Sequence, residues 1–435
     1  MKQTAGMTEE ATGHSMNMWS VAAMGVGAMV GAGIFALLGL VAIVAGKQTY
    51  ISFLLGGLVA TLSGYTHAKL AARYPDAGGI TEYFHEAYGT GRTSGALSLI
   101  YLITVAATIA MVAKAFGAYA SQLAFGDKSQ FWMGVFASAV TIMMVLLNIA
   151  GSALVGKAEV VLVGIKLTIL AVLILAGAYG MTEHASVSQV TPHFFTFAGS
   201  VGLTFFAYAG FGMMTNAAGR VRNPERTIPR AIYLALTIVI LLYAALAVVV
   251  LGSVPTAELR QHADTAVAVA AKPVLGQAGY VIVAIGALLA TASGINAWVF
   301  TAMQISAAMV KVGNLPGMFA HFVWRKGSLG LLFAVGAILL AIDFFDLTAL
   351  ARVASATFLI SYLTVQAAHW RLVRETKGSR LLVGAGTLFM AGVLGCFLWS
   401  TFLAQPWALA SVVGFLACSW LIEFFLARAK SDKTV

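Results

Sequence analysis

Long apolar runs separated by short polar connections occupy almost the whole chain. Apolar runs of about 20 residues are long enough to cross a membrane as helices, and this pattern predicts twelve spans. The predicted spans are residues 17–45, 49–72, 94–124, 131–151, 157–179, 197–218, 228–253, 276–311, 328–343, 346–370, 380–402 and 406–428. We therefore expect an all-α polytopic membrane protein with polar tails at 1–16 and 429–435.

The first span contains glycine at Gly25, Gly27, Gly31 and Gly33. A glycine inside a helix costs about 1 kcal/mol relative to alanine, and backbone groups freed by a break find no water in lipid. A break at this depth is typical of a backbone that lines a binding cavity. The spacing from Gly27 to Gly31 equally fits close packing of two helices, so both interpretations stay open at this point.

Span 6 carries a second glycine-punctuated stretch, Gly199–Gly212. Spans 1 and 6 are five apart, where a transporter built from inverted repeats has its paired broken helices. We expect a ten-helix transport core over 17–370, with repeat one at 17–179 and repeat two at 197–370. Residues 380–428 would add two unbroken helices, the eleventh and twelfth.

Composition supports the membrane assignment and charge gives its orientation. The chain is 60% hydrophobic and 10% charged, whereas soluble proteins carry about 25% charged residues. With the N-terminus inside, 19 of the 26 Lys and Arg residues lie on the cytoplasmic side and 4 on the other side. The remaining 3, Lys114, Lys166 and Arg352, fall inside spans. This distribution predicts that both termini are cytoplasmic, and it explains the net charge of +10 without a nucleic-acid partner.

Motifs for other classes of protein fail on context. Gly151–Ala158 resembles a phosphate-binding loop, but Ala158 stands where Ser or Thr binds Mg²⁺. Gly31–Ala36 fits a dinucleotide fingerprint inside a membrane run, not between a strand and a helix. His67 and His369 lie in different spans and form no catalytic set. We expect no enzyme activity, no cofactor and no metal, and we find no charge rings or repeated filter of a channel.

Four motifs together resemble the amino acid–polyamine–organocation (APC) permeases over about residues 17–320. The motifs are Gly31–Phe35, Tyr74–Gly79, Phe205–Phe211 with Asn223-Pro224, and Ala290–Asn296. The resemblance implies a LeuT-type core of five-plus-five inverted repeats with discontinuous helices 1 and 6. It also implies secondary transport of amino acids or amines.

The resemblance further implies a substrate site built from backbone. The implied residues are Gly31, Ala32, Gly33, Phe206, Ala207 and Ala209. Backbone N–H groups of the first three would bind the α-carboxylate, as expected at the N-terminus of a half-helix. Carbonyls of the last three would bind the α-ammonium. Phe206 would also be a lid over the site, with ordinary helix packing as the alternative.

Acidic residues are scarce where the family often has them. This chain has Gly212, Gly219 and Arg220 at such places, and only Glu159, near the inner end of span 5, approaches a span centre. An uncompensated cation in a low dielectric is costly, so we expect a zwitterionic substrate with an apolar or small polar side chain. The expected pocket-facing side chains are Met29, Phe206, Tyr208 and Trp298.

Lys166 lies in the middle of span 5, and a cation there costs at least about 2.5–3.5 kcal/mol. Desolvation favours the neutral amine, so this side chain is a candidate for binding and releasing a proton. In some permeases that this chain resembles, a lysine at the matching place occupies a sodium-site region, which implies proton coupling without Na⁺. The alternative is that Lys166 tethers span 5 to carbonyls of the span 1 break.

Two other basic residues, Lys114 and Arg352, lie inside predicted spans. Lys114 is about 20 Å along a helix from Asp127, too far to reach that surface easily, so it is a possible pathway residue. Arg352 follows Asp343 and Asp346, which predicts a local ion pair near the outer surface.

We interpret the chain as an inner-membrane secondary transporter that imports a neutral amino acid with protons by alternating access. Its expected partners are the amino acid, protons and the lipid bilayer, with no obligate protein partner. Two alternatives remain within the same class. One is a polyamine or cationic amino acid permease, and the other is an exchanger that is not coupled to protons.

Overall fold

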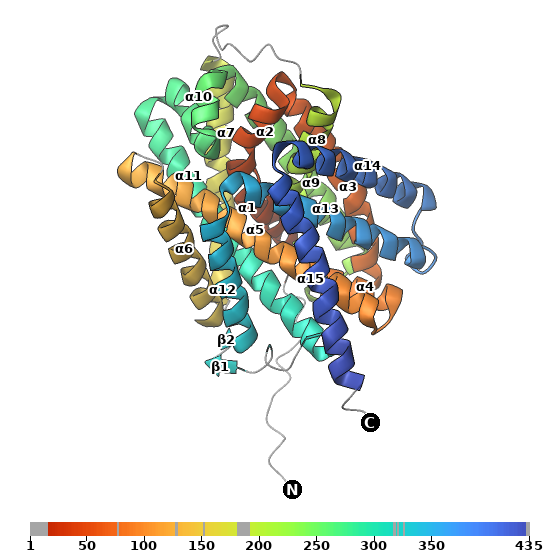
Figure 1. Ribbon diagram of the computed structural model, residues 1–435. Coiled ribbons are helices and arrows are strands. Elements are labelled where there is room, and N and C mark those ends of the chain that lie inside the picture. The colour runs from red at the N-terminus through yellow and green to blue at the C-terminus, as the bar shows by residue number, and fades with distance from the viewer. Residues whose placement is uncertain are drawn as a thin grey trace.

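A computed structural model shows a bundle of long helices packed against one another (Figure 1). The structure describes residues 16–75, 78–126, 129–150, 153–180, 192–315, 319, 322–324 and 327–431. The α-helices are α1 (Met18–Ala32), α2 (Ile34–Ala45), α3 (Thr49–Arg73), α4 (Ile80–Tyr88), α5 (Arg92–Phe125), α6 (Gln130–Ala150), α7 (Ala153–Gly180), α8 (Phe194–Tyr208), α9 (Pro224–Ser253), α10 (Thr256–Gln261), α11 (Ala266–Lys311), α12 (Leu329–Phe344), α13 (Leu347–Leu372), α14 (Arg380–Ala404) and α15 (Pro406–Ser431). The 3-10 helices are η1 (Gly46–Gln48), η2 (Ala209–Arg220) and η3 (Ala263–Thr265). A short antiparallel hairpin pairs β1 (Phe322–Trp324) with β2 (Gly327–Ser328).

Every predicted span lies on one helix or on a pair of consecutive helices. Within the described residues, ten helical segments are long and apolar enough to cross a membrane, with Ile34–Arg73 taken as one segment. Met18–Gly31 and Leu329–Phe344 are shorter apolar helices. The chain is thus a polytopic membrane protein whose described residues are helical apart from one small hairpin, and the count of twelve crossings stays a prediction.

Both glycine-rich spans are interrupted, but less deeply than their sequences suggest. The first span is helical from Met18 to Ala32, and only Gly33 separates α1 from α2. The sixth span changes at Ala209 from α8 to the tighter η2. Short 3-10 stretches often mark a strained or functional place in a helix. A third discontinuity divides α11 at Gly276, whose φ of 70° suits glycine. The apolar helical segment there runs over Ala263–Lys311, so the start of the eighth span at 276 stays a prediction.

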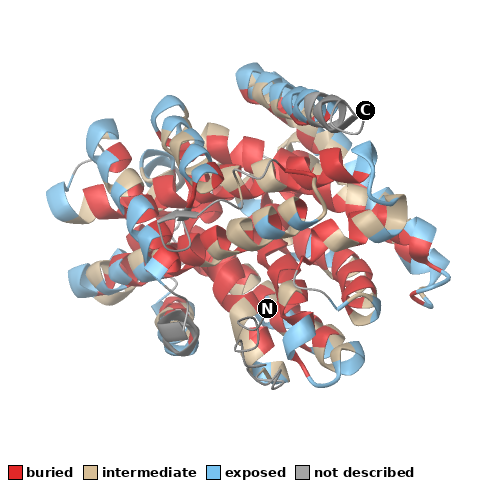
Figure 2. Ribbon diagram, turned by 90° about the horizontal axis from the view of Figure 1, so that it is seen from below, coloured by how far each residue is buried: buried red, intermediate tan, exposed pale blue. Residues whose placement is uncertain are grey.

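The buried core lies at the centre of the bundle, and the last two helices lie at its edge. Figure 2 shows buried residues in red through the middle and exposed residues in blue on the outer helices. α5 is largely buried, whereas α14 and α15 are largely exposed. Large apolar side chains of these two helices, including Trp399, Leu403 and Trp407, face outward, as expected of surfaces that contact lipid.

Candidate substrate site

The interruptions of the first and sixth spans touch each other. A Cβ placed at Gly33 would lie 2.5 Å from the carbonyl oxygen of Ala207, and a Cβ placed at Gly210 would lie 2.7 Å from the backbone nitrogen of Met29. Real Cβ atoms do not approach neighbours this closely, so only glycine permits the contact. Two segments almost 180 residues apart in sequence are therefore brought together at one place in the core.

Gly31 serves helix packing. A Cβ at this position would lie 2.6 Å from the carbonyl oxygen of Ala290 and 2.9 Å from the Cα of Gly294, both on α11. The close-packing interpretation is therefore confirmed for Gly31, while the interruption belongs to Gly33. The side chain of Ala32 lies outside the described residues.

The backbone of the first interruption is mostly hydrogen-bonded. The Gly33 N–H donates to the Met29 carbonyl at 2.8 Å, so it continues the helix ladder and is not a spare donor here. The Tyr243 hydroxyl donates to the Ala207 carbonyl at 3.4 Å and also hydrogen-bonds to the backbone of Ile34. A hydroxyl has one hydrogen, so the Ile34 N–H is the donor in that second bond. Tyr243 thus bridges the two interruptions.

A second tyrosine closes the other end of the sixth-span interruption. The Tyr362 hydroxyl, from α13, donates to the Ala209 carbonyl at 2.6 Å and hydrogen-bonds to the backbone of Gly212. A Cβ at Gly212 would collide with this hydroxyl. The tyrosine therefore occupies the space that a side chain at 212 would need, which gives a physical reason for glycine there.

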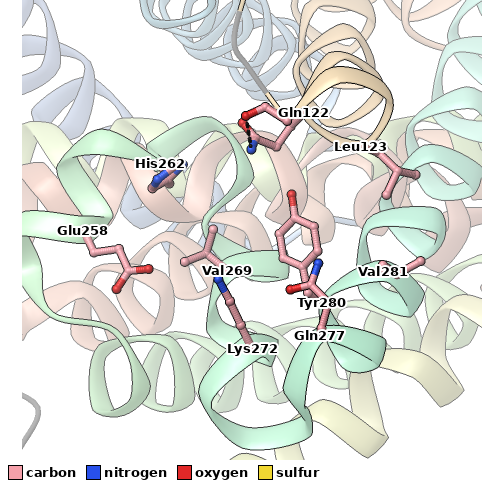
Figure 3. A pocket seen from close by; sticks show the side chains of 10 residues that line it. Gln122, Leu123, Glu258, His262, Val269, Lys272, Gln277, Tyr280 and Val281 are labelled. Carbon is pink, nitrogen blue, oxygen red and sulfur yellow. Dashed lines mark hydrogen bonds between the residues drawn. The ribbon is translucent and has the colours of Figure 1, made fainter.

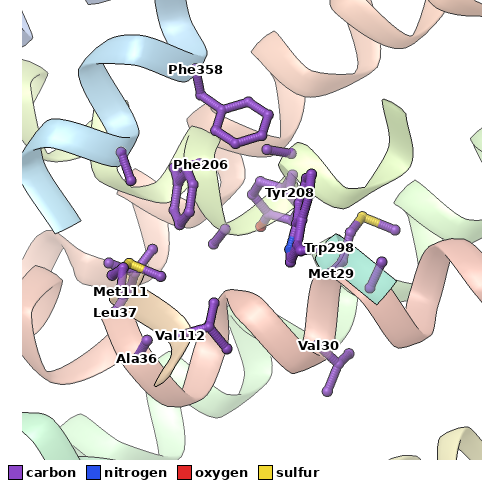
Figure 4. Close-up of a cluster of buried hydrophobic side chains, with 14 of the residues drawn as sticks. Met29, Val30, Ala36, Leu37, Met111, Val112, Phe206, Tyr208, Trp298 and Phe358 are labelled. Carbon is purple, nitrogen blue, oxygen red and sulfur yellow. The ribbon is translucent and has the colours of Figure 1, made fainter. Parts of the chain in front are cut away.

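Aromatic side chains surround the paired interruptions (Figure 4). Phe206 is 2% exposed and its ring centroid lies 5.3 Å from that of Phe358. Phe358 also lies 5.4 Å from Trp298 and 5.3 Å from Tyr362. Of the expected pocket residues, Met29, Phe206, Tyr208 and Trp298 are all buried and all drawn in this cluster.

Sequence reasoning missed Tyr243, Tyr362 and Phe358. No motif marks these residues, and Tyr243 lies in a continuous apolar run. Phe358 and Tyr362 carry one usable signal, since residues four apart share a helix face and an aromatic pair at that spacing can line one site.

Lys166 is almost fully buried, at 1% exposed. Its Nζ donates to Ser293 Oγ on α11 at 2.8 Å. One turn along α11, Asn296 Oδ1 accepts from Asn148 Nδ2 on α6 at 2.7 Å. α7 also contacts α1, so Lys166 lies where α7, α11 and the helix of the first interruption meet.

Comparison with known proteins identifies the family. A model of the family described as "Amino acid permease" matches residues 16–427. The chain belongs to this family. The permease is 44% identical over 418 residues to the "Inner membrane transport protein YbaT" of Escherichia coli, with 96% of this chain and 97% of the relative covered.

More distant relatives carry names that state a substrate. The permease is 27% identical to the "Methylthioribose transporter" of Bacillus subtilis, over 71% of this chain and 69% of the relative. It is 29% identical to the vacuolar "Cationic amino acid transporter 4" of Arabidopsis thaliana, over 79% of this chain and 60% of the relative. The permease is thus a multi-pass membrane transporter of the APC superfamily, and these names describe the relatives alone.

Lys114 of the permease is placed at a helix end. This lysine is 3% exposed and its ammonium nitrogen donates to the Ile342 carbonyl near the end of α12 at 2.6 Å. Asp343 and Asp346 follow and interact with it electrostatically. A cation is stabilised at a helix C-terminus, so this contact by itself accounts for its burial; a role in the pathway stays a prediction.

The expected ion pair of Arg352 is wrong. Its guanidinium donates to Thr401 Oγ1 on α14 at 3.4 Å. Asp346 instead caps α13 by accepting from the Ala349 N–H at 2.6 Å. Among the described residues no ion pair joins Arg352 to Asp343 or Asp346, although Asp346 acts on Arg352 at longer range. The helix cap competes for the carboxylate, and the sequence spacing did not reveal this.

His67 and His369 are nearer in space than their separate spans suggest. His369 Nδ1 lies 3.0 Å from the hydroxyl of Thr66, the neighbour of His67, and the ring of His67 lies 4.5 Å from that of Tyr362. Neither histidine belongs to a metal-ligand cluster, because the described residues contain no group of three His, Cys, Asp or Glu side chains suited to a metal ion.

Two hydrogen bonds involve described residues on either side of the connection between α3 and α4. Burial lowers the pKa of His85, and the neutral ring accepts from Asn314 Nδ2 at 3.0 Å. Tyr74 donates to the Glu375 carboxylate at 2.6 Å. The pKa of Tyr74 is raised, first because the side chain is partly buried and second because its hydroxyl bonds this carboxylate. These contacts join α4 and the end of α3 to segments that follow α11 and α13.

A separate hollow of about 320 Å³ opens at the ends of α5, α10 and α11 (Figure 3). Its lining includes Glu258, His262, Lys272 and Tyr280, and none of the residues of the two interruptions. Beside it, η3 packs directly on α2, because the backbone of Ala263 occupies the space above Gly39. The hollow is thus lined by side chains of both charges, and the contact between η3 and α2 beside it is closely packed.

Proposed function

We propose that this permease imports a neutral, zwitterionic amino acid together with protons, by alternating access, across the inner membrane with both termini in the cytoplasm. The observation that carries the proposal is the contact of the two interruptions at Gly33 and Ala207. At that contact the backbone of the first span and the carbonyls of the sixth span face one region. A zwitterion needs both kinds of backbone group in one place.

The charge of this region favours a substrate without net charge. Among the described residues the one buried carboxylate is Glu423 on α15, and it lies against Gly95 on α5 and not at the interruptions. A cationic side chain entering the region of the interruptions would therefore find no buried carboxylate of the described residues to pair with. Such burial of an unpaired charge is costly.

Lys166 is the proposed proton carrier. A buried amine is stable in its neutral form and gains a proton when the site opens to water. Its contact with Ser293 links α7 to α11, and α11 packs directly on Gly31. Protonation of Lys166 would therefore change interactions between helices that hold the substrate site, which couples the proton to the cycle.

Two tyrosine hydroxyls take the place of the substrate ammonium in this structure. Tyr243 donates a hydrogen bond to the carbonyl of Ala207 and Tyr362 to that of Ala209, and these carbonyls are the groups proposed for the ammonium. Substrate binding would exchange these neutral hydrogen bonds for charge-assisted ones, which are stronger. Gly31, Ala32 and Gly33 remain the proposed carboxylate side, which requires the Gly33 N–H to leave the Met29 carbonyl when substrate binds. Phe206 is the proposed cover over the substrate.

The test is uptake of a panel of radiolabelled compounds into proteoliposomes in Na⁺-free buffer, with and without an inward proton gradient. The panel contains neutral amino acids, arginine, a polyamine and methylthioribose. We expect gradient-stimulated uptake of neutral amino acids. Uptake of arginine or the polyamine alone would favour the cationic alternative, and uptake driven only by internal amino acid would favour the exchanger.

Lys166→Met tests the proton site, because methionine keeps the length and volume of the side chain but has no charge. We expect this variant to lose gradient-stimulated uptake. Lys47→Met, at an exposed position between α2 and α3, is the matched control and should behave as wild type. Gradient-stimulated uptake that survives in Lys166→Met would reduce Lys166 to a structural tether.

A further inference from the structure

Trp298 carries a buried hydrogen-bond donor with no acceptor. The side chain is 1% exposed, and among the described residues its indole nitrogen has no hydrogen-bond partner. The indole N–H can only donate. Buried polar groups are nearly always paired in proteins, so an unpaired donor at the centre of a molecule calls for an explanation.

The position of Trp298 connects this donor to the substrate site. Ala290, Gly294 and Trp298 are four residues apart on α11 and so share one helix face. The first two pack against Gly31 of the first interrupted span. The indole ring also packs against Phe358, with the ring centroids 5.4 Å apart, and Figure 4 shows it beside Tyr208 in the buried cluster.

A second unpaired polar group lies one turn from Phe358. The hydroxyl of Ser355 on α13 is fully buried and has no partner among the described residues. Ser355 and Phe358 are three residues apart, so they lie on the same side of α13. Two helices that meet at Phe358 therefore each carry an unsatisfied polar group into an otherwise apolar and aromatic region.

We propose that the indole N–H of Trp298 donates a hydrogen bond to an oxygen on the side chain of the transported amino acid. The permease then selects neutral amino acids that carry a hydroxyl or a side-chain amide over aliphatic amino acids of the same shape. This inference rests on the proposed function, and it narrows the substrate class. An aliphatic side chain leaves the buried donor unpaired, and a site built to bond a polar group rejects the analogue that lacks it.

Isosteric pairs isolate this one hydrogen bond. Threonine and valine have nearly the same shape and differ by a hydroxyl in place of one methyl group. Asparagine and leucine are also similar in shape and differ by a side-chain amide, with one oxygen and one NH₂, in place of two methyl groups. The measurement is the inhibition constant of each amino acid against uptake of a transported neutral amino acid in proteoliposomes. We expect threonine and asparagine to inhibit at least about tenfold more strongly than valine and leucine. In Trp298→Phe, which keeps an aromatic ring but has no N–H, the ratios should fall to within about twofold.

The matched control is Trp399→Phe on α14, where the side chain is 51% exposed, and it should keep the wild-type ratios. Thermal unfolding and gel filtration report whether each variant is folded. If Trp298→Phe does not fold, residue 298 is replaced by β-(3-benzothienyl)alanine, whose sulfur takes the place of the N–H in a ring of the same shape.

The possible results distinguish a failure of the proposed selectivity for polar side chains from a failure of the proposed transport of neutral amino acids. Wild-type uptake of neutral amino acids with no preference for threonine over valine overturns the inference and leaves the proposed function standing. So does an equal loss of affinity for every amino acid in Trp298→Phe, since the indole would then bind a group common to all of them. Absence of amino acid uptake by the wild type, with uptake of another panel compound, overturns the proposed function itself.

Discussion

Gly33 is a residue at which the backbones of the two interrupted spans approach closely. A methyl group there would lie 2.5 Å from the Ala207 carbonyl oxygen and 2.9 Å from the Ala207 Cα. Because these neighbours are backbone atoms, they cannot move aside as a flexible side chain can. We expect Gly33→Ala to force α1 and α8 apart and to lower the rate of uptake at least about tenfold.

Gly395→Ala is the control for this substitution, since a Cβ at Gly395 on α14 meets nothing within 4 Å. Replacing an unconstrained helical glycine by alanine stabilises a protein by about 0.5–1 kcal/mol. Uptake by the Gly395→Ala variant should therefore equal that of wild type. Normal uptake by Gly33→Ala would show that the contact at Ala207 is not needed for transport.

Tyr362 supports the fold and competes with the proposed substrate. Tyr362→Phe removes the hydroxyl that bonds the Ala209 carbonyl and leaves a buried acceptor unpaired, which costs about 1–3 kcal/mol. The same carbonyl becomes available to the substrate ammonium. We expect a lower free energy of unfolding and a lower KM, measured by thermal unfolding and by uptake. Tyr50→Phe, at a 39% exposed position, should change neither quantity, and a raised KM in Tyr362→Phe would contradict the competition.

At the scale of elements, the helices could be predicted from sequence because apolar run length is a direct physical requirement of a membrane span. The depth of each interruption could not. The glycines from Gly25 to Gly33 suggested a broad unwound stretch, but a glycine with a neighbouring backbone against it can stay helical, as Gly31 does against α11. Only the packing of a second element decides which glycine breaks the helix.

The partners of the buried cations were unpredictable for a related reason. The sequence suggests Asp127, 13 residues after Lys114, as the nearest acidic residue, whereas the carbonyl that Lys114 bonds, Ile342, is 228 residues away in sequence. Arg352 was judged against nearby carboxylates, whereas its guanidinium bonds Thr401. Spacing along one helix gives local partners, but a buried charge takes the partner that its neighbouring helices supply.

The contact between Lys114 and the end of α12 predicts a specific effect. Lys114→Met leaves the Ile342 carbonyl without its buried donor, so we expect the free energy of unfolding to fall by about 1–3 kcal/mol. The KM of folded protein should stay within about twofold of wild type, because the contact lies between α5 and α12 and not at the interruptions. Lys311→Met, at an exposed position, is the control. A large rise in KM for Lys114→Met with unchanged stability would instead place Lys114 on the substrate pathway.

At the scale of the whole molecule, the buried helices around the interruptions and the exposed final helices have different tasks. α1, α8 and α11 hold the site through contacts that only small residues permit. α14 and α15 cover the edge of the bundle and present apolar surface outward. The family match extends through both groups, over residues 16–427, so the peripheral pair is part of the shared architecture. The division into a ten-helix transport core and two added helices stays a prediction.

Orientation is the remaining property of the whole molecule that the charge pattern predicts. Basic residues are retained on the cytoplasmic side, so the connection between α2 and α3 should lie outside and the end of α3 inside. We expect a cysteine at Lys47 to react with a membrane-impermeant maleimide in intact spheroplasts, and a cysteine at Arg73 to react only after permeabilisation. Both positions are exposed in the structure, so a difference in labelling reports the side of the membrane. Cys396 and Cys418 are first replaced by serine, and the parent without cysteines gives the background. The reverse labelling pattern would show that the whole bundle has the opposite orientation.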